Sequence, residues 1–370
     1  MSEPGEEPSP AQSERLYLRP LAIHSGTTAD QATAGRRALP LAGGPLAFAE
    51  VELILRGPAR CRSVRVGLDD LRDWADRQGG IVQSRVNVLL ERLSRPRPPF
   101  AGLTMEVPRL MGVVNVTPDS FSDGGRFLDP AEAVRQALRL MDDGADIIDI
   151  GGESTRPGAE PVDEAEERRR VLPVVQGIAP LGVPLSVDTH HAGTMAAALT
   201  AGVSIVNDVT ALAGDARSLA LVAAQGCQVV LMHMQGDPRT MQVNPQYEHA
   251  ALDVFDALAA RVAACRAAGI AEANIAVDPG IGFGKAISHN LEILGRLALF
   301  HGLGCPVLLG ASRKGFIAKL SDGERPDQRL AGSLAAALAG LAQGVQLFRV
   351  HDVRETRQAF AVARAIAAAA

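Results

Sequence analysis

The strongest constraint on the fold of this 370-residue chain is a unit that repeats eight times from Leu110 onward. Each unit has a short apolar run, a loop and an alanine- and leucine-rich segment with helical periodicity. Strands are predicted at 110–116, 146–151, 184–188, 204–208, 228–234, 275–278, 306–310 and 346–350. Helices are predicted near 130–143, 163–179, 192–201, 216–225, 248–268, 288–300, 328–343 and 353–369. Eight units over about 260 residues favour an α/β fold, a (β/α)8 barrel, with a doubly wound open sheet as the alternative.

Polar residues follow the predicted strands at nearly every strand end. In a barrel, the carboxyl ends of all strands share one face, and that face carries the active site. A single Asn or Asp there is usually a turn or helix-cap residue, but eight positions in succession favour a common site. In chain order the positions hold Asn115, Glu153 with Thr155 and Arg156, Asp188, Asn207 with Asp208, His233, Asp278, Ser312 with Lys314, and Arg349 with His351.

The first of these strand ends opens into an unusually long loop. The segment after Asn115 reads VTPDSFSDGG and continues to the helix predicted at Pro130. A connection between a strand and a helix needs roughly two to six residues, and this one has about a dozen. The extra length indicates a ligand-binding loop.

Charge and composition exclude several classes of protein. A net charge of -5 provides no basic surface for nucleic acid. No apolar run reaches the length of a membrane helix, and the acidic start, MSEPGEEPSP, is unlike a signal peptide. The four cysteines are far apart and fit reduced thiols. We therefore expect a cytoplasmic protein with neither nucleic-acid nor membrane partners.

Lysine is rare, with only Lys285, Lys314 and Lys319 among 37 basic residues. Because arginine serves almost everywhere else, each lysine is worth examining for a specific role. Lys314, in GASRKGFI directly after a predicted strand, is a site candidate. Lys319 is interpreted as a surface residue, whereas Lys285, which ends DPGIGFGK, fits either interpretation equally.

The chain before the repeats is expected to form separate parts. Residues 1–14 are rich in Pro, Glu and Ser and predict a disordered tail. Residues 15–104 predict a small α+β extension, with strands at 46–55 and 63–66, helices at 69–78 and 82–93, and a stiff proline-rich linker at 94–100. Dimerisation, partner binding and bracing of the barrel all fit this extension, and the barrel is expected to occupy residues 105–370.

Long motifs follow one another in order from about Pro108 to the end of the chain. They read MGVVNVTPDSFSDGG, DIIDIGGESTRPGA, SVDT, IVNDV, LMHMQGDPRTMQ, VDPGIGFGK, GASRKGFI and FRVHDV. Together they resemble the dihydropteroate synthases of the pterin-binding barrel superfamily. The resemblance implies a (β/α)8 barrel that joins 4-aminobenzoate to 6-hydroxymethyl-7,8-dihydropterin diphosphate in folate biosynthesis. The products would be 7,8-dihydropteroate and diphosphate.

The resemblance also implies a pterin site, for which carboxylates and amides suit the donors and acceptors of the ring edge. Asp278 would accept from the 2-amino edge and Lys314 would donate to the carbonyl side. Asp188 would in addition stabilise positive charge that develops on the methylene. The implied catalytic residues are Asp188, Lys314 and Asn115. The implied pterin-binding residues are Asp188, Asn207, Met232, Asp278, Gly282 and Lys314.

The departing diphosphate would bind to Arg349, His351 and Asn115 by the same resemblance. Arg349 and His351 alternate along one strand, so both side chains point to the same side. Mg²⁺ is the implied cofactor, because charge collects on the departing oxygens. The amide oxygen of Asn115 is a weak ligand alone, so the metal is expected to bind mainly together with the diphosphate.

The implied 4-aminobenzoate pocket lies between two loops, at 117–125 and 153–159, that would close over the reacting centre. Its implied residues are Thr155, Arg156, Pro157, Phe283 and Ser312. Other polar residues in the motifs, namely His233, Glu153 and Asp208, are expected mainly to brace strand ends and loops. His190 and His191 show no constellation in the sequence and are expected at the surface or in helix caps.

The resemblance further implies a homodimer that sulfonamides inhibit by competing with 4-aminobenzoate. Two other functions compete with synthesis of dihydropteroate. A methyltetrahydrofolate-dependent methyltransferase would need the pterin residues, but Arg349 and His351 favour the synthase because the methyltransferase expels no diphosphate. A non-catalytic pterin-binding protein is disfavoured by the intact TPDSFSDGG and ESTRPGA loops.

Overall fold

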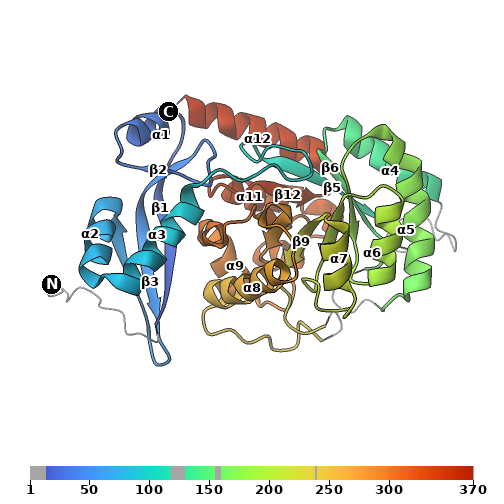
Figure 1. The fold of residues 1–370 in the computed structure, drawn as a ribbon. Coiled ribbons are helices and arrows are strands. Elements are labelled where there is room, and N and C mark those ends of the chain that lie inside the picture. The colour runs from blue at the N-terminus through green and yellow to red at the C-terminus, as the bar shows by residue number, and fades with distance from the viewer. Residues whose placement is uncertain (1–13, 118–129, 155–159, 238–239, 370) are drawn as a thin grey trace. The chain divides into compact units, whose positions relative to one another are not determined.

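The computed structural model describes residues 14–117, 130–154, 160–237 and 240–369 (Figure 1). The chain divides into two compact units. The smaller unit comprises Met1–Pro96 with the short segments Ala298–Gly304 and Ile366–Ala370. The larger unit comprises Arg97–Leu297 and Cys305–Ala365. Among the described residues, no helix is both long enough and apolar enough to cross a membrane.

The smaller unit is built around strand β3, which pairs antiparallel with β1, β2 and β4. Its core joins Phe48 and Leu55 of β3 with Trp74 of α2 and Leu93 of α3, all nearly or fully buried. Its elements are β1 (Arg15–His24), α1 (Gly26–Ala34), β2 (Leu39–Pro40), β3 (Ala47–Arg56), β4 (Cys61–Gly67), α2 (Leu68–Gln78) and α3 (Gly80–Ser94). The predicted α+β character of this region is confirmed.

Three elements of this unit were not predicted: β1, α1 and the two-residue strand β2. Pro20 interrupts the pattern of β1, and α1 has no strong apolar face because its sequence is GTTADQATA. Pairing along the whole length of β3 supplies what the local sequence of β1 lacks, since every residue from Arg15 to Leu21 has a partner there. Tertiary pairing thus overrides local preference.

The larger unit contains eight parallel strands in the order β10-β9-β8-β7-β6-β5-β12-β11. The two ends of this sheet meet, because the backbone N–H of Val277 donates to the carbonyl of Pro306 at 2.9 Å and Val277 bridges to Val307. The strands are β5 (Arg109–Asn115), β6 (Ile147–Gly151), β7 (Leu185–Asp188), β8 (Ile205–Asp208), β9 (Gln228–Met232), β10 (Ile275–Asp278), β11 (Leu308–Leu309) and β12 (Leu347–Val350). This closure confirms the predicted barrel and is incompatible with the open sheet.

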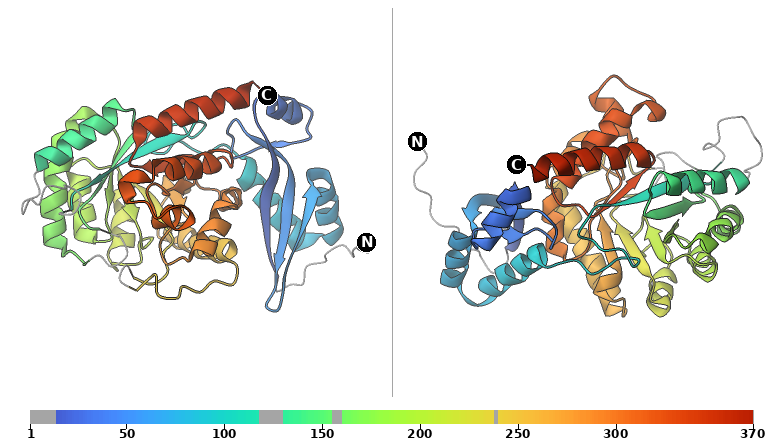
Figure 2. Two further views of the ribbon diagram at one scale, coloured as in Figure 1. Left: turned by 180° about the vertical axis from the view of Figure 1, so that it is seen from behind. Right: turned by 90° about the horizontal axis from the view of Figure 1, so that it is seen from above.

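Helices follow the strands and lie on the outside of the barrel, as two further views show (Figure 2). The main helices are α4 (Pro130–Asp142), α5 (Glu164–Ile178), α6 (Ala192–Thr200), α7 (Ser218–Gln225), α8 (Ala250–Ala267), α9 (Ile287–Leu294), α11 (Leu330–Leu341) and α12 (Val353–Ala368). Each predicted helix is present within a few residues of its expected bounds, except that the helix expected at 288–300 ends as α9 at Leu294. A short unpredicted helix, α10 (Gly315–Leu320), follows β11.

The amino ends of the strands are closed by an apolar cluster that includes Phe100 and Met105. Phe100 is fully buried, and its backbone pairs with Leu103 in both directions at 2.9 Å. The strands contribute Met111, Ile147, Ile205, Val230, Ala276, Leu308 and Leu347. The boundary expected at residues 104 and 105 therefore differs from the structure, in which the larger unit begins at Arg97 because the end of the predicted linker packs into the barrel.

Replacing Phe100 with Ala should lower the free energy of unfolding of the barrel by about 3–5 kcal/mol, because it leaves a cavity among the strand starts. Urea unfolding followed by circular dichroism would measure the change. Leu320→Ala, at a side chain that is 54% exposed, is the matched control and should stay within about 0.5 kcal/mol of the wild type. Equal effects of the two substitutions would show that Phe100 does not close the barrel.

Candidate active site

The inward-facing side chains of the strands are apolar at the amino ends, in the cluster around Phe100, and polar at the carboxyl ends. Side chains two residues apart share one face of a strand. From the apolar residues of the cluster, a step of two therefore reaches Asp149 on β6, Asn207 on β8, Met232 on β9, Asp278 on β10 and Arg349 on β12. The interior of the barrel thus changes from apolar at the amino ends to charged at the carboxyl ends.

Arg349 connects three strands at this face. Its Nε donates to Asp149 Oδ2 at 2.6 Å and its Nη2 donates to Asp188 Oδ2 at 2.7 Å. Asn207 Nδ2 donates to the same oxygen of Asp149 at 3.2 Å. Asp188 and Asn207 are neighbours in the parallel register of β7 and β8. The structure therefore brings three of the predicted site residues together through Asp149, an acid that was not among them.

Burial shapes the electrostatics of this network. It raises the pKa of Asp188 from its ordinary value of 3.8 to about 7, against the opposing charge of Arg349 and with a further rise from the charge of Asp149. Burial lowers the pKa of Arg349, but the charges of Asp149 and Asp188 outweigh it and the net shift is upward. Arg349 therefore stays charged, while the carboxyl of Asp188 changes its charge near neutral pH.

Asp149 is fully buried, and its Oδ1 has no hydrogen-bond partner among the described residues. The sequence did contain a signal for it, because DIIDIGG places a carboxylate in the middle of an otherwise apolar strand. A buried charge in such a position requires a partner. Reading each strand with a period of two would have grouped Asp149 with the other inward-facing residues.

The strand β10 ends in Asp278, which is 5% exposed. Its Oδ1 accepts from the backbone N–H of Gly280 at 2.7 Å. Its Oδ2 borders Gly310, where a Cβ would lie 3.6 Å away, so the missing side chain leaves room beside this oxygen. Burial raises the pKa of Asp278, and the charge of Lys314 acts in the opposite direction.

Lys314 reaches the site from the loop after β11. Its ammonium donates to the carbonyl of Ile281 and lies 4.2 Å from the centre of the Phe283 ring. Its aliphatic stem lies beside Gly282, where a Cβ would be 3.2 Å from Cδ of the lysine. Burial lowers the pKa of Lys314 to about 8, although the charge of Asp278 opposes this shift. Lys314, Gly282 and Phe283 are thus together, as expected for one subsite.

The backbone before Lys314 has an unusual conformation. Arg313 has a φ of 57°, in the left-handed region that is costly for a residue with a Cβ. Its guanidinium pairs with Asp352, with Nε 3.0 Å from Oδ2. Nearby, Ser312 Oγ lies 3.0 Å from His351 Nδ1. The turn therefore sends the two consecutive basic side chains to different partners, with Lys314 directed toward Ile281 and Phe283.

Lys285 is buried, which decides against the surface role that the sequence left open for it. Its ammonium lies 3.0 Å from His233 Nδ1 and donates to the carbonyls of His233 at 3.2 Å and Phe283 at 3.0 Å. Burial lowers the pKa of Lys285 to about 7 and that of His233 to about 3, with the lysine charge adding to the shift of the histidine. Lys319 is exposed, as expected. Lys285 therefore fixes the glycine-rich turn to the end of β9.

Gly280 makes that turn possible. It has a φ of 70°, and a Cβ at this position would lie 2.0 Å from the carbonyl oxygen of His233 and 3.3 Å from Cγ of Met232. Only glycine permits this approach. Met232 itself is 4% exposed. The predicted packing residue Met232 therefore lies against the turn that carries Gly282 and Phe283.

Asn115, at the end of β5, lies across Gly151 from Asp188. A Cβ at Gly151 would be 3.7 Å from Asn115 Oδ1 and 3.8 Å from Asp188 Oδ2. Both oxygens thus border the small space above this glycine. The other end-of-strand carboxylate, Asp208, is fully buried and accepts from Thr210 and Leu212, which fits the expected bracing role.

Several predictions concern residues outside those that the structure describes. Thr155, Arg156 and Pro157, expected in the aminobenzoate pocket, belong to this group, as do residues 118–125 of the first loop and 155–159 of the second. Their proposed roles remain predictions. Of the implied pocket, the described members are Phe283 and Ser312.

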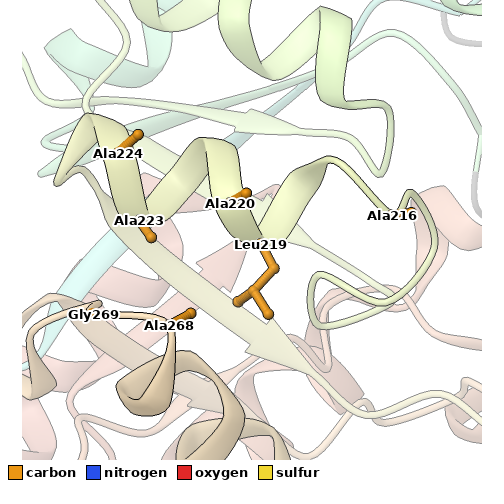
Figure 3. A pocket seen from close by; sticks show the side chains of 7 residues that line it. All are labelled: Ala216, Leu219, Ala220, Ala223, Ala224, Ala268 and Gly269. Atoms are coloured by element: carbon orange, nitrogen blue, oxygen red, sulfur yellow. The ribbon is translucent and has the colours of Figure 1, made fainter.

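A shallow surface hollow elsewhere on the barrel is unrelated to this cluster (Figure 3). It is lined by Ala216 before α7, by residues of α7 and by two residues after α8: Leu219, Ala220, Ala223, Ala224, Ala268 and Gly269. No lining side chain carries a charge or a hydroxyl group. The hollow therefore offers nothing that could orient a polar substrate.

Comparison with known proteins agrees with the motifs. The sequence profile of a family described as "Pterin binding enzyme" matches residues 111–351. The dihydropteroate synthase of Escherichia coli K12 is 45% identical over 264 residues, which are 71% of this chain and 93% of that protein. These values extend the similarity across nearly the whole length of the relative.

Solved structures show the same similarity. The dihydropteroate synthase of Xanthomonas albilineans with 4-aminobenzoic acid is 46% identical, with a TM-score of 0.69, and the match covers 73% of this chain and 98% of that one. The enzyme of the same organism in complex with 7,8-dihydropteroate is 43% identical, with a TM-score of 0.66 and the same coverage. The matched 73% of this chain is about the length of the barrel unit.

Replacing Asp149 with Asn should destabilise the protein by about 1–3 kcal/mol, because the amide removes a charge that Arg349 contacts and can place a donor against other donors. Urea unfolding would measure the loss. Asp142→Asn, at an exposed position on α4, is the control and should change stability by less than about 0.5 kcal/mol. A loss of stability no greater than that of the control would show that the contacts of Asp149 do not stabilise the protein.

Proposed function

Since this chain belongs to the pterin-binding enzyme family, as a dihydropteroate synthase, we propose which residues of its barrel bind each substrate and which assist the reaction. The enzyme condenses 6-hydroxymethyl-7,8-dihydropterin diphosphate with 4-aminobenzoate, giving 7,8-dihydropteroate and diphosphate in folate biosynthesis. The relatives named above are synthases, which favours this reaction over methyl transfer and over non-catalytic pterin binding.

The observation that carries the proposal is the polar cluster at the carboxyl ends of the strands. It combines buried carboxylates, an amide, a lysine and an arginine at the face where barrel enzymes bind substrate. The members are Asp149, Asp188, Asn207, Asp278, Lys314 and Arg349. The carboxylates, the amide and the lysine match a ligand whose one edge has both hydrogen-bond donors and acceptors. The arginine matches an anionic group at the other end of that ligand.

The pterin edge would meet Asp278, Asn207 and Lys314. The Oδ2 of Asp278 borders the space beside Gly310 and can accept from the 2-amino group. Asn207 offers an amide to a ring nitrogen, and the ammonium of Lys314 can donate to the ring carbonyl. Met232 and Gly282 would border the ring, since Gly282 lies beside Lys314 and Met232 packs against Gly280 of the same turn. Because Asp278 and Asn207 are buried, a ligand without the matching atoms would displace water from them without replacing its hydrogen bonds.

The diphosphate would bind to Arg349, His351 and Asn115. Arg349 uses Nε and Nη2 to hold the two carboxylates, so its Nη1 group is the part of the guanidinium best suited to an anion. His351 follows Arg349 by two residues and comes directly after Val350, the last residue of β12. Its Nδ1 lies 3.0 Å from Ser312 Oγ, and we propose that its imidazole contacts the anion.

Mg²⁺ fits this end of the site. Asn115 Oδ1 and Asp188 Oδ2 border the same space over Gly151, and oxygen donors are the ligands that Mg²⁺ prefers. Asn115 would hold the ion together with phosphate oxygens of the substrate. When bound, the ion would neutralise charge that accumulates on the departing diphosphate.

Asp188 would stabilise the positive charge that develops on the pterin methylene when the bond to diphosphate breaks. Its carboxylate is already fixed by Arg349, so it needs no reorganisation at the moment of reaction. The amine of 4-aminobenzoate then attacks the methylene and loses a proton. Phe283 and Ser312, with Thr155, Arg156 and Pro157, are the proposed pocket for this second substrate.

The direct test combines the purified chain with Mg²⁺, the pterin diphosphate and 4-aminobenzoate, and follows dihydropteroate and diphosphate together. Both products should appear in equal amounts. Asp278→Asn should lower kcat/KM for the pterin diphosphate by about 10- to 100-fold, since one hydrogen bond to a charged group is lost. Asp322→Asn, at an exposed position, should leave it unchanged. Absence of product, or equal activity of both variants, would refute the proposal.

The pKa of Asp188 predicts a pH dependence. Because burial raises it to about 7, the side chain is mostly neutral below pH 7 and mostly ionised above it. If the ionised form is the active one, kcat/KM should rise with pH through about 7 and fall again above about 8, where Lys314 loses its proton. Asp188→Asn should lower kcat/KM by about 100-fold or more and should remove the lower bend. A bend at the same pH in the variant would assign it to another group.

We also propose that the enzyme is a cytoplasmic homodimer and that sulfonamides compete with 4-aminobenzoate, as the family resemblance implies. Light scattering of the full chain should then give about twice the monomer mass of 38.8 kDa. A mass equal to that of one chain at the concentrations used for assay would rule out the dimer. Sulfonamide inhibition should disappear at saturating 4-aminobenzoate.

A further inference from the structure

Three potential metal ligands lie together on the loops after β6 and β7, beside the proposed substrate site. Glu153 follows β6 by two residues, and His190 and His191 follow the last residue of β7, Asp188. The two strands are paired in parallel, with Gly151 opposite Asp188. One ligand atom from each of the three side chains lies within 4.8 Å of the others. The expectation that His190 and His191 have no constellation is therefore wrong.

Glu153 has an oxygen without a partner at this position. Its Oε1 accepts from the backbone N–H of Val162 at 3.2 Å. Its Oε2 is buried and has no hydrogen-bond partner among the described residues, and Nδ1 of His190 is 3.5 Å away. The side chain of Glu153 is only 11% exposed. A buried carboxylate oxygen that makes no hydrogen bond is costly, and a cation would satisfy it.

His191 is oriented by a second carboxylate. Its Nδ1 lies 3.1 Å from Oε2 of Glu167, which also accepts from the hydroxyl of Thr189 at 2.7 Å. Glu167 is fully buried. Because a carboxylate can only accept, the proton of the neutral ring is placed on Nδ1, and Nε2 keeps its lone pair. A histidine held in this way by a carboxylate is the usual arrangement of a metal-binding histidine.

The two imidazole rings are close to each other, with centres 4.0 Å apart and planes at 46°. Their side chains are 31% and 21% exposed, so the rings have room to rotate and a water molecule can approach. Ligand atoms around a tetrahedral Zn²⁺ lie about 3.3 Å from one another, given metal–ligand distances of about 2.0–2.2 Å. Since the three ligand atoms already lie within 4.8 Å of one another, side-chain shifts of roughly one ångström would bring them to this spacing.

We propose that Glu153, His190 and His191 bind one divalent transition-metal ion, with Zn²⁺ the best match. Two imidazoles and one carboxylate suit Zn²⁺, and water would complete the tetrahedron. Asp208 is not one of the clustered ligands, and its two oxygens accept from Thr210 and Leu212. The nitrogen ligands distinguish this site from the all-oxygen environment proposed for Mg²⁺ at Asn115.

The bound ion would link the two loops. It would connect the segment after β6 with the segment between β7 and α6, so that Glu153 is held to the chain that carries Asp188. No step of the reaction needs it, and its role is structural. Its chief effect should therefore be on stability, since an ion that binds only the folded state raises the melting temperature.

The test uses the full chain without a histidine tag, freed of metal with a chelator, and titrated with ZnCl₂ or CoCl₂. Calorimetry should show one saturable site, and bound Co²⁺ should give the visible absorption of a tetrahedral complex. The double variant His190→Asn with His191→Asn should lose this site. Glu153→Gln and Glu167→Gln should each weaken binding by about 10- to 100-fold, the latter by releasing the ring of His191. ZnCl₂ should raise the melting temperature of the wild type but not that of the double variant.

The matched control is His24→Asn with His249→Asn, which removes the same number of histidines elsewhere and should bind as the wild type does. Should a variant fail to fold, Zn²⁺ must still protect His190 and His191 of the wild type from diethyl pyrocarbonate, as mapped by peptide mass. Absence of saturable binding, equal binding by the double variant and its control, or modification of both histidines at full rate in Zn²⁺ would overturn the proposal.

Discussion

The guanidinium of Arg349, held between Asp149 and Asp188, is the interaction on which the rest of the site depends. It joins β12 to β6 and β7 inside the barrel, with contacts of 2.6 and 2.7 Å. One cation faces two carboxylates, and a buried charge without a partner is unstable. The same contacts fix Asp188 where positive charge is proposed to develop and leave Nη1 of Arg349 for an anion. Arg349 thus both positions the carboxylate of Asp188 and offsets the negative charge of Asp149 and Asp188.

The barrel makes this arrangement possible because its interior changes character along each strand. At the amino ends, apolar side chains and Phe100 fill the space, and two residues further on the same face presents carboxylates and amides. The apolar layer keeps water from the lower side of the charged cluster. Desolvation then raises the pKa of Asp188 and Asp278 and lowers that of Lys314. The polar residues therefore interact in a medium where electrostatic effects are strong.

The sequence predicted the barrel and most of the cluster for a physical reason, since strands with both faces buried are continuous apolar runs that end in polar residues. Its local signal for Asp149, a carboxylate in an apolar strand, did not identify the partners, because Asn207 and Arg349 are 58 and 200 residues away along the chain. Lys285 was ambiguous for the same reason, as only the folded turn shows that it contacts His233. Glu153, His190 and His191 likewise become neighbours only when β6 and β7 pair. Local patterns predict elements, whereas contacts between elements appear only in the fold.

The most direct test of this account is a double-mutant cycle between Arg349 and the diphosphate. Calorimetry would compare binding of 6-hydroxymethyl-7,8-dihydropterin diphosphate and of 6-hydroxymethyl-7,8-dihydropterin, with Mg²⁺ present, to the wild type and to Arg349→Ala. The cycle separates loss of the anion contact from any general weakening of the pterin site. We predict that the wild type gains affinity from the diphosphate and that the variant loses about 1.5–3 kcal/mol of this gain. An equal gain in both proteins would contradict the account.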